Sequence, residues 1–488
     1  MKTVKNLLIL FILLLLLCSS FQYKYMFVQE KPLDGFYLQT DKPDLKYFTW
    51  HRWFSDDFQS EMQKRIEDRV GFRNSLYRVR NQVDFSFFNI VNAKGFIAGE
   101  NGYLYEEDYI HEYKGEYFIG TGALDKKMVR LKNVYDSLKA RNIELVIVFE
   151  PGKASILPEF IPERFRPKQR TLSNYEYIRK KAGTLGLPFL DLNQYFLDLK
   201  DTAKYPLFHK YGMHWSLYGV SYTLDTLVKY MEKRCSTDLP DIHFTGIEFS
   251  ETARSSDSDI GELMNIILPL PSTMAAYPKV SIEENPAKRN LSVLTIADSY
   301  YLNFATDLAS TLFKENVYWY YNNRLYPYHN EVPPHWIDKS DLLGEYTKYN
   351  VILLMISEIN MHYGFWNFAD EAYLAFHPEV KDDYIYKIEN DIRNERTWFQ
   401  FIVKKARQQN CSLEDMIRRD AQYSFYSNYN NLKDKTESDS INFIIYNMES
   451  NQDWLATVSD KAAEQNVSLD SMKLSEAKYL YRQFKQKK

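Results

Sequence analysis

The sequence predicts an α/β protein whose central domain is a doubly wound parallel sheet. Two observations carry this prediction: continuous apolar runs alternate with amphipathic helical segments, and polar residues follow the end of each run. Continuous apolar runs are typical of strands buried on both faces, and strands separated by helices pair in parallel. The expected strands are residues 143–149, 188–192, 292–297 and 349–356, and the expected helices are residues 126–139, 175–185 and 219–234. We place this domain at residues 120–375, between an N-terminal helical segment and a C-terminal helical repeat region.

Residues 1–30 are expected to direct export. Lys2 and Lys5 precede an unbroken apolar run at residues 7–18, and a basic flank before a short apolar core is typical of an export signal. The run is shorter than the roughly 20 residues that a membrane-spanning helix needs. Three alternatives therefore stay open: a cleaved signal peptide, a signal-anchor that extends past Lys24 as a transmembrane helix, and lipid modification at Cys18. We expect a cell-envelope protein that faces the periplasm, anchored to the inner membrane by this segment or secreted after cleavage.

Residues 31–119 are expected to form a helical segment followed by a hairpin. Apolar residues recur at helical spacing through residues 58–89, with a break at Gly71 where that glycine can cap one helix before the next begins. Residues 95–105 contain an Asn-Gly pair, which is preferred in tight hairpin turns. Packing is the expected role of this part of the chain.

Residues 376–488 contain an internal repeat at an offset of 56 residues, with units at about 388–427 and 444–484. Ten residue types recur at this offset: Trp398, Lys405, Ala406, Gln409, Asn410, Ser412, Leu413, Met416, Ala421 and Tyr423 return as Trp454, Lys461, Ala462, Gln465, Asn466, Ser468, Leu469, Met472, Ala477 and Tyr479. Each unit predicts a helix that carries Trp, a turn at Gln-Asn, a Ser N-cap and a second helix, and residues 430–440 link the units. These helical hairpins could form a stabilising appendage, a small bundle or a docking surface.

The composition excludes some classes of partner. The 61 basic residues nearly balance the 65 acidic ones, so nothing favours a nucleic-acid partner. The cysteines, Cys18, Cys235 and Cys411, form neither a disulfide framework nor a metal-binding pattern, and we expect no metal and no cofactor. Aromatic residues make up 16% of the chain, with 39 Tyr. This suits contact with carbohydrate, or it reflects the composition of the source genome.

Ser299 and His214 are the residues expected to carry chemistry. Ser299 follows the expected strand at 292–297, and the carboxyl ends of strands are where open α/β sheets place their sites. Alone, this serine would also suit an ordinary helix N-cap. His214 lies in the loop at residues 205–219, at the same edge of the sheet. A histidine can take the proton of a serine hydroxyl and return it to a leaving group, so the pair suits nucleophilic acyl transfer.

Two details of this site stay open. His209 is a rival histidine in the same loop, although its spacing from His214 fits no common zinc pattern. A third group normally orients the imidazole of such a histidine. The candidates are Asp191, Asp298 and Glu358, and the sequence does not choose among them.

These stretches resemble the SGNH-hydrolase-like proteins of the AlgJ/AlgX type, which act in O-acetylation of exported polysaccharides such as alginate. The likeness runs along residues 50–370 through five motifs, at residues 69–73 (RVGFR), 99–105 (GENGYLY), 151–159 (PGKASILPE), 214–216 (HWS) and 297–299 (ADS). It implies that Ser299 is the acyl-carrying nucleophile, that His214 is its base, and that a membrane O-acyltransferase supplies the acyl group. We also expect Trp215, Lys153 and Tyr300 to bind substrate or to support the site.

The chain departs from the family at Gly212. The family usually has Asp-x-His-Trp, with the Asp orienting the His, whereas this chain has Gly212-Met213-His214-Trp215. Either another carboxylate substitutes, or the pair works without one, or activity is lost. The leading prediction is an exported acyl (acetyl) transferase or esterase that acts on an envelope polysaccharide. The alternative is a non-catalytic glycan-binding or assembly protein on a degenerate SGNH scaffold; a plain esterase of soluble substrates is disfavoured by the leader and the repeats.

Overall fold

The computed structural model describes residues 2–428 except 36–52, 55, 167–168, 306–308, 327–336, 338, 340, 378–380, 395 and 410. Beyond residue 428 it describes residues 441, 444–445, 448, 455, 458–459, 461–462 and 467–486.

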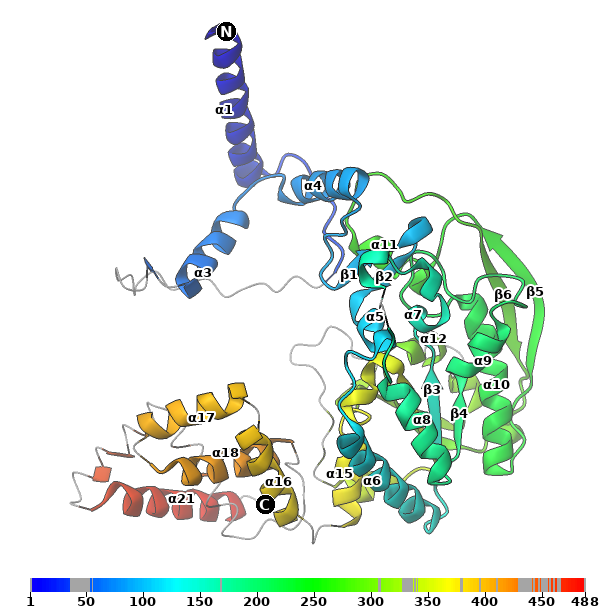
Figure 1. Ribbon diagram of the computed structural model, residues 1–488, viewed down its shortest axis with the longest axis vertical. Coiled ribbons are helices and arrows are strands. Elements are labelled where there is room, and N and C mark those ends of the chain that lie inside the picture. Colours follow the sequence, from blue (N-terminus) through cyan, green and yellow to red (C-terminus); the bar gives the residue numbers. More distant parts are fainter. Residues whose placement is uncertain are drawn as a thin grey trace.

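A six-stranded sheet forms the centre of the molecule, in the order β4-β3-β10-β7-β8-β9. Its strands β3 and β4 are labelled in Figure 1. Its strands are β3 (Glu144–Glu150), β4 (Phe189–Asp191), β7 (Ser292–Ala297), β8 (Glu315–Tyr320), β9 (Arg324–Tyr326) and β10 (Val351–Ser357). The first five strands in this order run parallel, and β9 runs antiparallel to β8. The predicted α/β fold is therefore confirmed, and the carboxyl ends of β3, β7 and β10 meet at one edge.

Helices cover both faces of this sheet, as a doubly wound fold requires. In β3, Leu145 and Ile147 belong to one hydrophobic core, and Val146 and Val148 belong to the other. The first core is closed by α6 (Thr121–Lys139), α8 (Asn174–Thr184) and α15 (Phe368–Phe376), and the second by α5 (Glu107–Lys114), α9 (Leu192–Leu199) and α10 (Leu217–Cys235). This alternation explains why the strand sequences read as continuous apolar runs.

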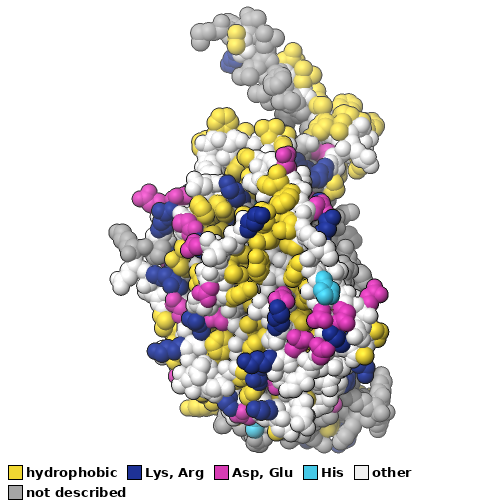
Figure 2. Space-filling model, turned by 90° about the vertical axis from the view of Figure 1, so that its right-hand side faces the viewer, with side chains coloured by type: hydrophobic (Ala, Val, Ile, Leu, Met, Phe, Trp, Pro, Cys, Tyr) yellow, Lys and Arg dark blue, Asp and Glu magenta, His cyan; other side chains and the backbone are white. Residues whose placement is uncertain are grey.

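Three pieces of β-structure lie on or beside this domain. The expected hairpin forms from β1 (Phe96–Ala98) and β2 (Leu104–Glu106), and Ile97 and Tyr105 pack into the second core. The edge strands β8 and β9 were not predicted, because β8 is rich in aromatic rather than aliphatic residues. A second hairpin, β5 (Ile242–Ser250) with β6 (Ala275–Ile282), escaped prediction because β5 is exposed along most of its length and a register shift between Phe244 and Gly246 interrupts its alternation of apolar residues. Figure 2 shows the side of the molecule that carries β5 and β6, and hydrophobic side chains gather on it.

The N-terminal part consists of α1 (Lys2–Tyr25), α3 (Asp56–Glu67) and α4 (Arg73–Phe88). The predicted break near Gly71 is present, but its reason differs from the expected helix cap. A Cβ at Gly71 would lie 2.1 Å from the Ser19 carbonyl oxygen, so the glycine permits the close approach of α1, and Phe72 takes the left-handed conformation instead. Among the described residues, no helix has both the length and the apolar character needed to cross a membrane.

The C-terminal part is helical, with α16 (Lys381–Asn394), α17 (Arg396–Gln408), α18 (Leu413–Asn428) and α21 (Leu469–Gln486). Ser412 and Ser468 each accept a hydrogen bond from the backbone three residues later, as the repeat predicts. A further pair recurs at the same offset, because Lys405 pairs with Asp420 and Lys461 pairs with Glu476, both at 3.0 Å. The predicted turn residue Asn410, its counterparts Gln465 and Asn466, Trp454 and the linker 430–440 lie outside the described residues.

The remaining short helices connect these elements around the sheet edge. They are α7 (Lys153–Ile156), α11 (Asp259–Leu263), α12 (Leu302–Ala305), α13 (Ala309–Leu312), α14 (Leu342–Tyr346) and the 3₁₀ turns η2 (Glu100–Gly102), η3 (Pro158–Phe160), η4 (Glu163–Phe165), η5 (Ser255–Asp257), η6 (Pro286–Lys288), η7 (Ser299–Tyr301) and η8 (Glu358–Tyr363).

Candidate active site

Ser299 is the first residue of the turn that follows β7. The strand ends at Ala297, and the Asp298 carboxylate accepts a hydrogen bond from the Tyr300 N–H at 3.1 Å, which starts η7. The other Asp298 oxygen accepts from the backbone N–H and the hydroxyl of Ser357, at 3.1 and 2.6 Å. Asp298 therefore joins the ends of β7 and β10 and fixes the backbone from which Ser299 projects.

His214 is presented by a loop that is anchored on both sides. Ser216 accepts a hydrogen bond from the Gly219 N–H at 3.0 Å and caps α10, as predicted. Trp215 is fully buried, and its ring packs edge-on against Tyr300 at a centroid distance of 5.0 Å. The Tyr300 ring also contacts the His214 imidazole at 4.8 Å. Trp215 and Tyr300 are thus buried supports of the imidazole rather than exposed substrate contacts.

The two predicted reactive residues meet. The Nε2 atom of His214 lies 2.7 Å from the hydroxyl oxygen of Ser299, which is hydrogen-bonding distance. His209 is the rival that the structure removes from this position, because its Nε2 atom contacts the Thr273 hydroxyl at 3.0 Å. The pKa of His209 is lowered to about 4, mainly by burial, so this residue is neutral at physiological pH.

The carboxylate beside His214 belongs to Asp259, which the sequence did not single out. One Asp259 oxygen lies 2.6 Å from His214 Nδ1, and the other accepts a hydrogen bond from the Met213 N–H at 2.7 Å. The same carboxylate thus fixes both the imidazole and the backbone that carries it. Ser299, His214 and Asp259 form a continuous chain of hydrogen bonds, the arrangement in which a carboxylate sets the tautomer of a catalytic histidine.

Gly212 and Asp259 are structurally linked. A Cβ at Gly212 would lie 2.4 Å from the Ser256 carbonyl oxygen and 3.1 Å from the Asp257 backbone, too close to be accommodated. The segment that leads into Asp259 therefore packs against the bare face of Gly212. The same packing brings a carboxylate from a distant part of the chain to the histidine whose usual Asp neighbour is missing.

The carboxylates predicted to orient His214 are engaged elsewhere. Asp298 ties β7 to β10, as described above. Asp191 caps α9 through the Gln194 N–H at 3.0 Å and pairs with Arg179 at 2.6 Å. Glu358 accepts hydrogen bonds from the Gly152 N–H at 3.1 Å and from the Ser155 hydroxyl at 2.5 Å, and burial raises its pKa to about 8. Among the described residues, the carboxylate that contacts His214 is that of Asp259, and none of these three candidates does.

Lys153 supports the histidine loop from beneath. Its ammonium group is buried and lies 2.7 to 3.0 Å from four backbone carbonyl oxygens, those of Leu104, His209, Lys210 and Gly212. Burial lowers its pKa to about 7. Because these carbonyls belong to β2 and to the loop before His214, Lys153 fixes that loop rather than presenting a charge to a substrate.

Tyr321 is a second residue that sequence reasoning missed. It follows β8 in the left-handed conformation, with φ 50°, and its N–H donates to the Ala297 carbonyl at 2.9 Å. Its hydroxyl interacts with Ser299, and burial raises its pKa far above the usual value, so the group remains a proton donor. The run of tyrosines at residues 320–321 was the available sequence signal, and it carried no meaning until β8 was placed.

The part of the chain that the structure describes contains no group of three or more His, Cys, Asp or Glu side chains arranged to hold a metal ion.

Residues 96–290 match the family model described as the SGNH hydrolase-like domain of the acetyltransferase AlgX. This span covers less than half of the 488 residues; it contains His214 and Asp259 and ends before Ser299. No curated protein sequence matches the chain.

Three solved structures are similar to the chain. The O-acetyltransferase domain of Pseudomonas putida AlgJ gives a TM-score of 0.37 at 16% identity, over 55% of this chain and 92% of that one. Pseudomonas aeruginosa AlgX gives a TM-score of 0.38 at 14% identity, over 62% of this chain and 70% of that one. Bacillus cereus PatB1 with a sulfonyl adduct gives a TM-score of 0.35 at 13% identity, over 56% of this chain and 99% of that one. On the family match, residues 96–290 are similar to the SGNH hydrolase-like domain of AlgX.

Proposed function

We propose that this protein is an acetyltransferase that modifies an exported polysaccharide of the cell envelope through a covalent acetyl-Ser299 intermediate. One observation carries the proposal: the hydroxyl of Ser299, the imidazole of His214 and the carboxylate of Asp259 are joined by contacts of 2.7 and 2.6 Å. A nucleophile, a base and a group that orients the base are the parts that acyl transfer requires. The matched family is named for an acetyltransferase, which supports the choice of acetyl.

The proposed reaction has two half-reactions. In the first, Ser299 Oγ bonds to the carbonyl carbon of the donor ester while His214 Nε2 takes the hydroxyl proton. The tetrahedral intermediate then breaks the bond to the donor alcohol, which leaves with that proton. In the second, an acceptor hydroxyl gives its proton to His214 and attacks the acetyl carbon. The Ser299–acyl bond breaks, and Ser299 regains the proton. With water as the acceptor, the same steps give esterase activity.

Two donors in this proposal would hold the oxyanion of each intermediate. The Tyr300 N–H is already bound by Asp298, so it is not free for this task. We assign the role to the backbone N–H of Ser299 together with the hydroxyl of Tyr321, which interacts with Ser299. Donors fixed beside the nucleophile stabilise developing negative charge without reorganising during the reaction.

The donor and location also belong to this proposal. The resemblance implies that a membrane O-acyltransferase supplies the acetyl group on the outer side of the membrane. The apolar run at residues 7–18 supports export and attachment of the chain to the inner membrane. A non-catalytic glycan-binding role rested on the missing carboxylate at Gly212, and the position of Asp259 beside His214 favours catalysis instead.

Intact-protein mass spectrometry after incubation with 4-nitrophenyl acetate tests the proposal. We expect one acetyl adduct in the wild type, located at Ser299 by peptide mapping, and none in Ser299→Ala. The matched control is Ser281→Ala, which removes an exposed hydroxyl on β6 and leaves the adduct in place. An adduct of equal yield in Ser299→Ala, or no adduct in the wild type, would refute the serine mechanism.

A further inference from the structure

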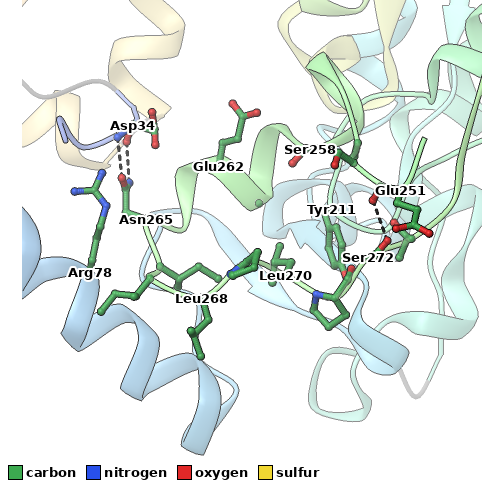
Figure 3. Close-up of a pocket in the computed structure, with 18 of the residues that line it drawn as sticks. Asp34, Arg78, Tyr211, Glu251, Ser258, Glu262, Asn265, Leu268, Leu270 and Ser272 are labelled. Atoms are coloured by element: carbon green, nitrogen blue, oxygen red, sulfur yellow. Dashed lines mark hydrogen bonds between the residues drawn. The ribbon is translucent and has the colours of Figure 1, made fainter. Parts of the chain in front are cut away.

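A cavity of about 560 Å³ lies beside α11, the short helix that begins at Asp259 (Figure 3). Its walls come from three places: the N-terminal segment with α4, the short helix α11, and residues 265–273. This volume is within the usual range of small-molecule sites, which is roughly 300–1,000 Å³.

Hydrogen bonds fix both ends of the wall formed by residues 265–273. At one end the Asp34 N–H donates to the Asn265 side chain at 2.8 Å, and that side chain donates back to the Asp34 carbonyl at 2.9 Å. At the other end the Ser272 hydroxyl donates to the Glu251 carbonyl at 3.0 Å (Figure 3). The cavity is therefore formed before any ligand binds, which lowers the entropy cost of binding.

The charged side chains that line the cavity are negative on balance. Lys31 pairs with Asp34 at 3.5 Å, and the Arg78 guanidinium donates to the backbone carbonyls of residues 31 and 32. Within the described residues, the carboxylates of Glu251 and Glu262 have neither a hydrogen bond nor an ion pair. The lining therefore carries three carboxylates, those of Asp34, Glu251 and Glu262, against the two cations of Lys31 and Arg78. This negative balance disfavours acidic ligands such as phosphates, nucleotides and uronate-rich glycans.

The opposite wall is apolar. Residues 266–271 read Ile-Ile-Leu-Pro-Leu-Pro, and Ile267 and Leu268 are 55% and 61% exposed. The cavity thus presents hydrocarbon on one side and carboxylates on the other. A pyranose ring has the matching shape, because its C–H face is apolar and its hydroxyl groups donate hydrogen bonds to carboxylates.

The cavity also shares two elements with the candidate active site. Gly261 and Glu262 line it from α11, whose first residue is Asp259. Tyr211 lines it from the His214 loop, and its backbone carbonyl accepts hydrogen bonds from Ile260 and Gly261 at 3.1 Å. A ligand in the cavity would lie directly behind the backbone that positions the acid and the base.

We propose that this cavity binds a non-acidic stretch of the acceptor polysaccharide, with Glu251 and Glu262 accepting hydrogen bonds from sugar hydroxyls. That the bound glycan is the acetyl acceptor rests on the proposed function. The class of ligand, a non-acidic glycan, rests on the cavity alone. This preference for a non-acidic glycan would distinguish the chain from a protein that binds a polyuronate.

Calorimetric titration of the full chain tests the proposal, with cellohexaose, mannohexaose and chitohexaose as neutral probes and hexaguluronate as the acidic probe. We expect at least one neutral hexaose to bind, and the Glu251→Gln/Glu262→Gln double variant to bind it at least tenfold more weakly. Hexaguluronate should not bind the wild type. The matched control is Glu284→Gln, which neutralises an exposed carboxylate just past β6 and outside the cavity, and should bind as the wild type does.

The proposal is overturned if no neutral probe binds, if the double variant binds as tightly as the wild type, or if hexaguluronate binds as well as the neutral probes. Acetylation of Ser299 by 4-nitrophenyl acetate, measured on the same variants, reports the proposed function separately. We expect it to be unchanged in the Glu284→Gln control. If Ser299 is never acetylated while carboxylate-dependent binding persists, the transferase proposal fails and the cavity remains a glycan site.

Discussion

Asp259 and Asp298 both lie close to the Ser299–His214 pair, but their carboxylates have different partners. Asp298 is the chain neighbour of Ser299, yet its carboxylate binds backbone and side-chain donors of Tyr300, Ser357 and Asn360. Asp259 is 45 residues from His214 in the chain, yet its carboxylate contacts the imidazole. The Asp298 carboxylate links the ends of β7 and β10, and the Asp259 carboxylate contacts the His214 imidazole. Proximity in the sequence therefore does not decide which carboxylate serves the chemistry.

The largest effect is expected from Asp259→Asn, which should lower the rate of Ser299 acetylation by about 10³- to 10⁴-fold. The amide keeps the shape of the side chain but favours the wrong imidazole tautomer and cannot stabilise imidazolium. Stopped-flow kinetics with 4-nitrophenyl acetate measures this rate. Urea unfolding should show a stability within about 1 kcal/mol of the wild type. A rate loss below tenfold would show that His214 does not depend on this carboxylate.

Asp298→Ala should act on stability instead. Its carboxylate is buried and accepts hydrogen bonds at 2.6 to 3.1 Å from three residues, so its removal leaves several donors without a partner. We expect the free energy of unfolding to fall by about 3 kcal/mol. Urea denaturation followed by tryptophan fluorescence measures this loss. An unchanged midpoint with a large loss of acetylation rate would reverse the roles that we assign to the two aspartates.

Gly212→Asp restores the sequence pattern of the family and should not restore the function. The new Cβ would lie 2.4 Å from the Ser256 carbonyl oxygen, so the segment before Asp259 must move away. We expect a destabilisation of about 1–3 kcal/mol. In the Asp259→Asn background the substitution should give no recovery of acetylation rate. Recovery to within tenfold of the wild type would mean that position 212 can still supply the orienting acid. Gly246→Asp, at an exposed glycine whose Cβ meets nothing within 4 Å, is the control.

A pH-dependent effect concerns Glu358, a third carboxyl group at this edge. Burial raises its pKa to about 8, so the folded protein holds a proton that the unfolded chain releases above the ordinary pKa. Stability from this group is therefore present at pH 5 and is lost as the pH rises toward 8, by at most about 1.4 kcal/mol per pH unit. Urea unfolding from pH 5 to 8 should give a flatter profile for Glu358→Gln than for the wild type. Identical slopes would contradict this pKa.

The sequence was informative where one local pattern decided the structure. β3 and β10 were predicted because aliphatic residues run without interruption through strands buried on both faces. Ser299 and His214 were predicted because each follows a strand and carries a family motif, and the structure places them in contact.

The remaining parts depend on contacts between distant segments. Asp259 lies in the polar stretch at residues 255–259, where nothing local distinguishes it from Asp257. Tyr321 gained its place only through the pairing of β8 with β7, a register that no single strand encodes. Lys153 was singled out by its motif, but its four carbonyl partners come from two other segments, so its buried supporting role could not be read from the sequence.

The close packing at Gly212 has a consequence for how such sites change over time. An Asp at position 212 and the approach of residues 256–257 exclude each other, because the same space cannot hold a side chain and a backbone. A chain with an Asp at position 212 therefore needs a different path for residues 256–257. Relatives should then fall into two groups, one with the acid two residues before the histidine and one with glycine there and the acid on a later loop. A search that requires the first pattern would discard working members of the second.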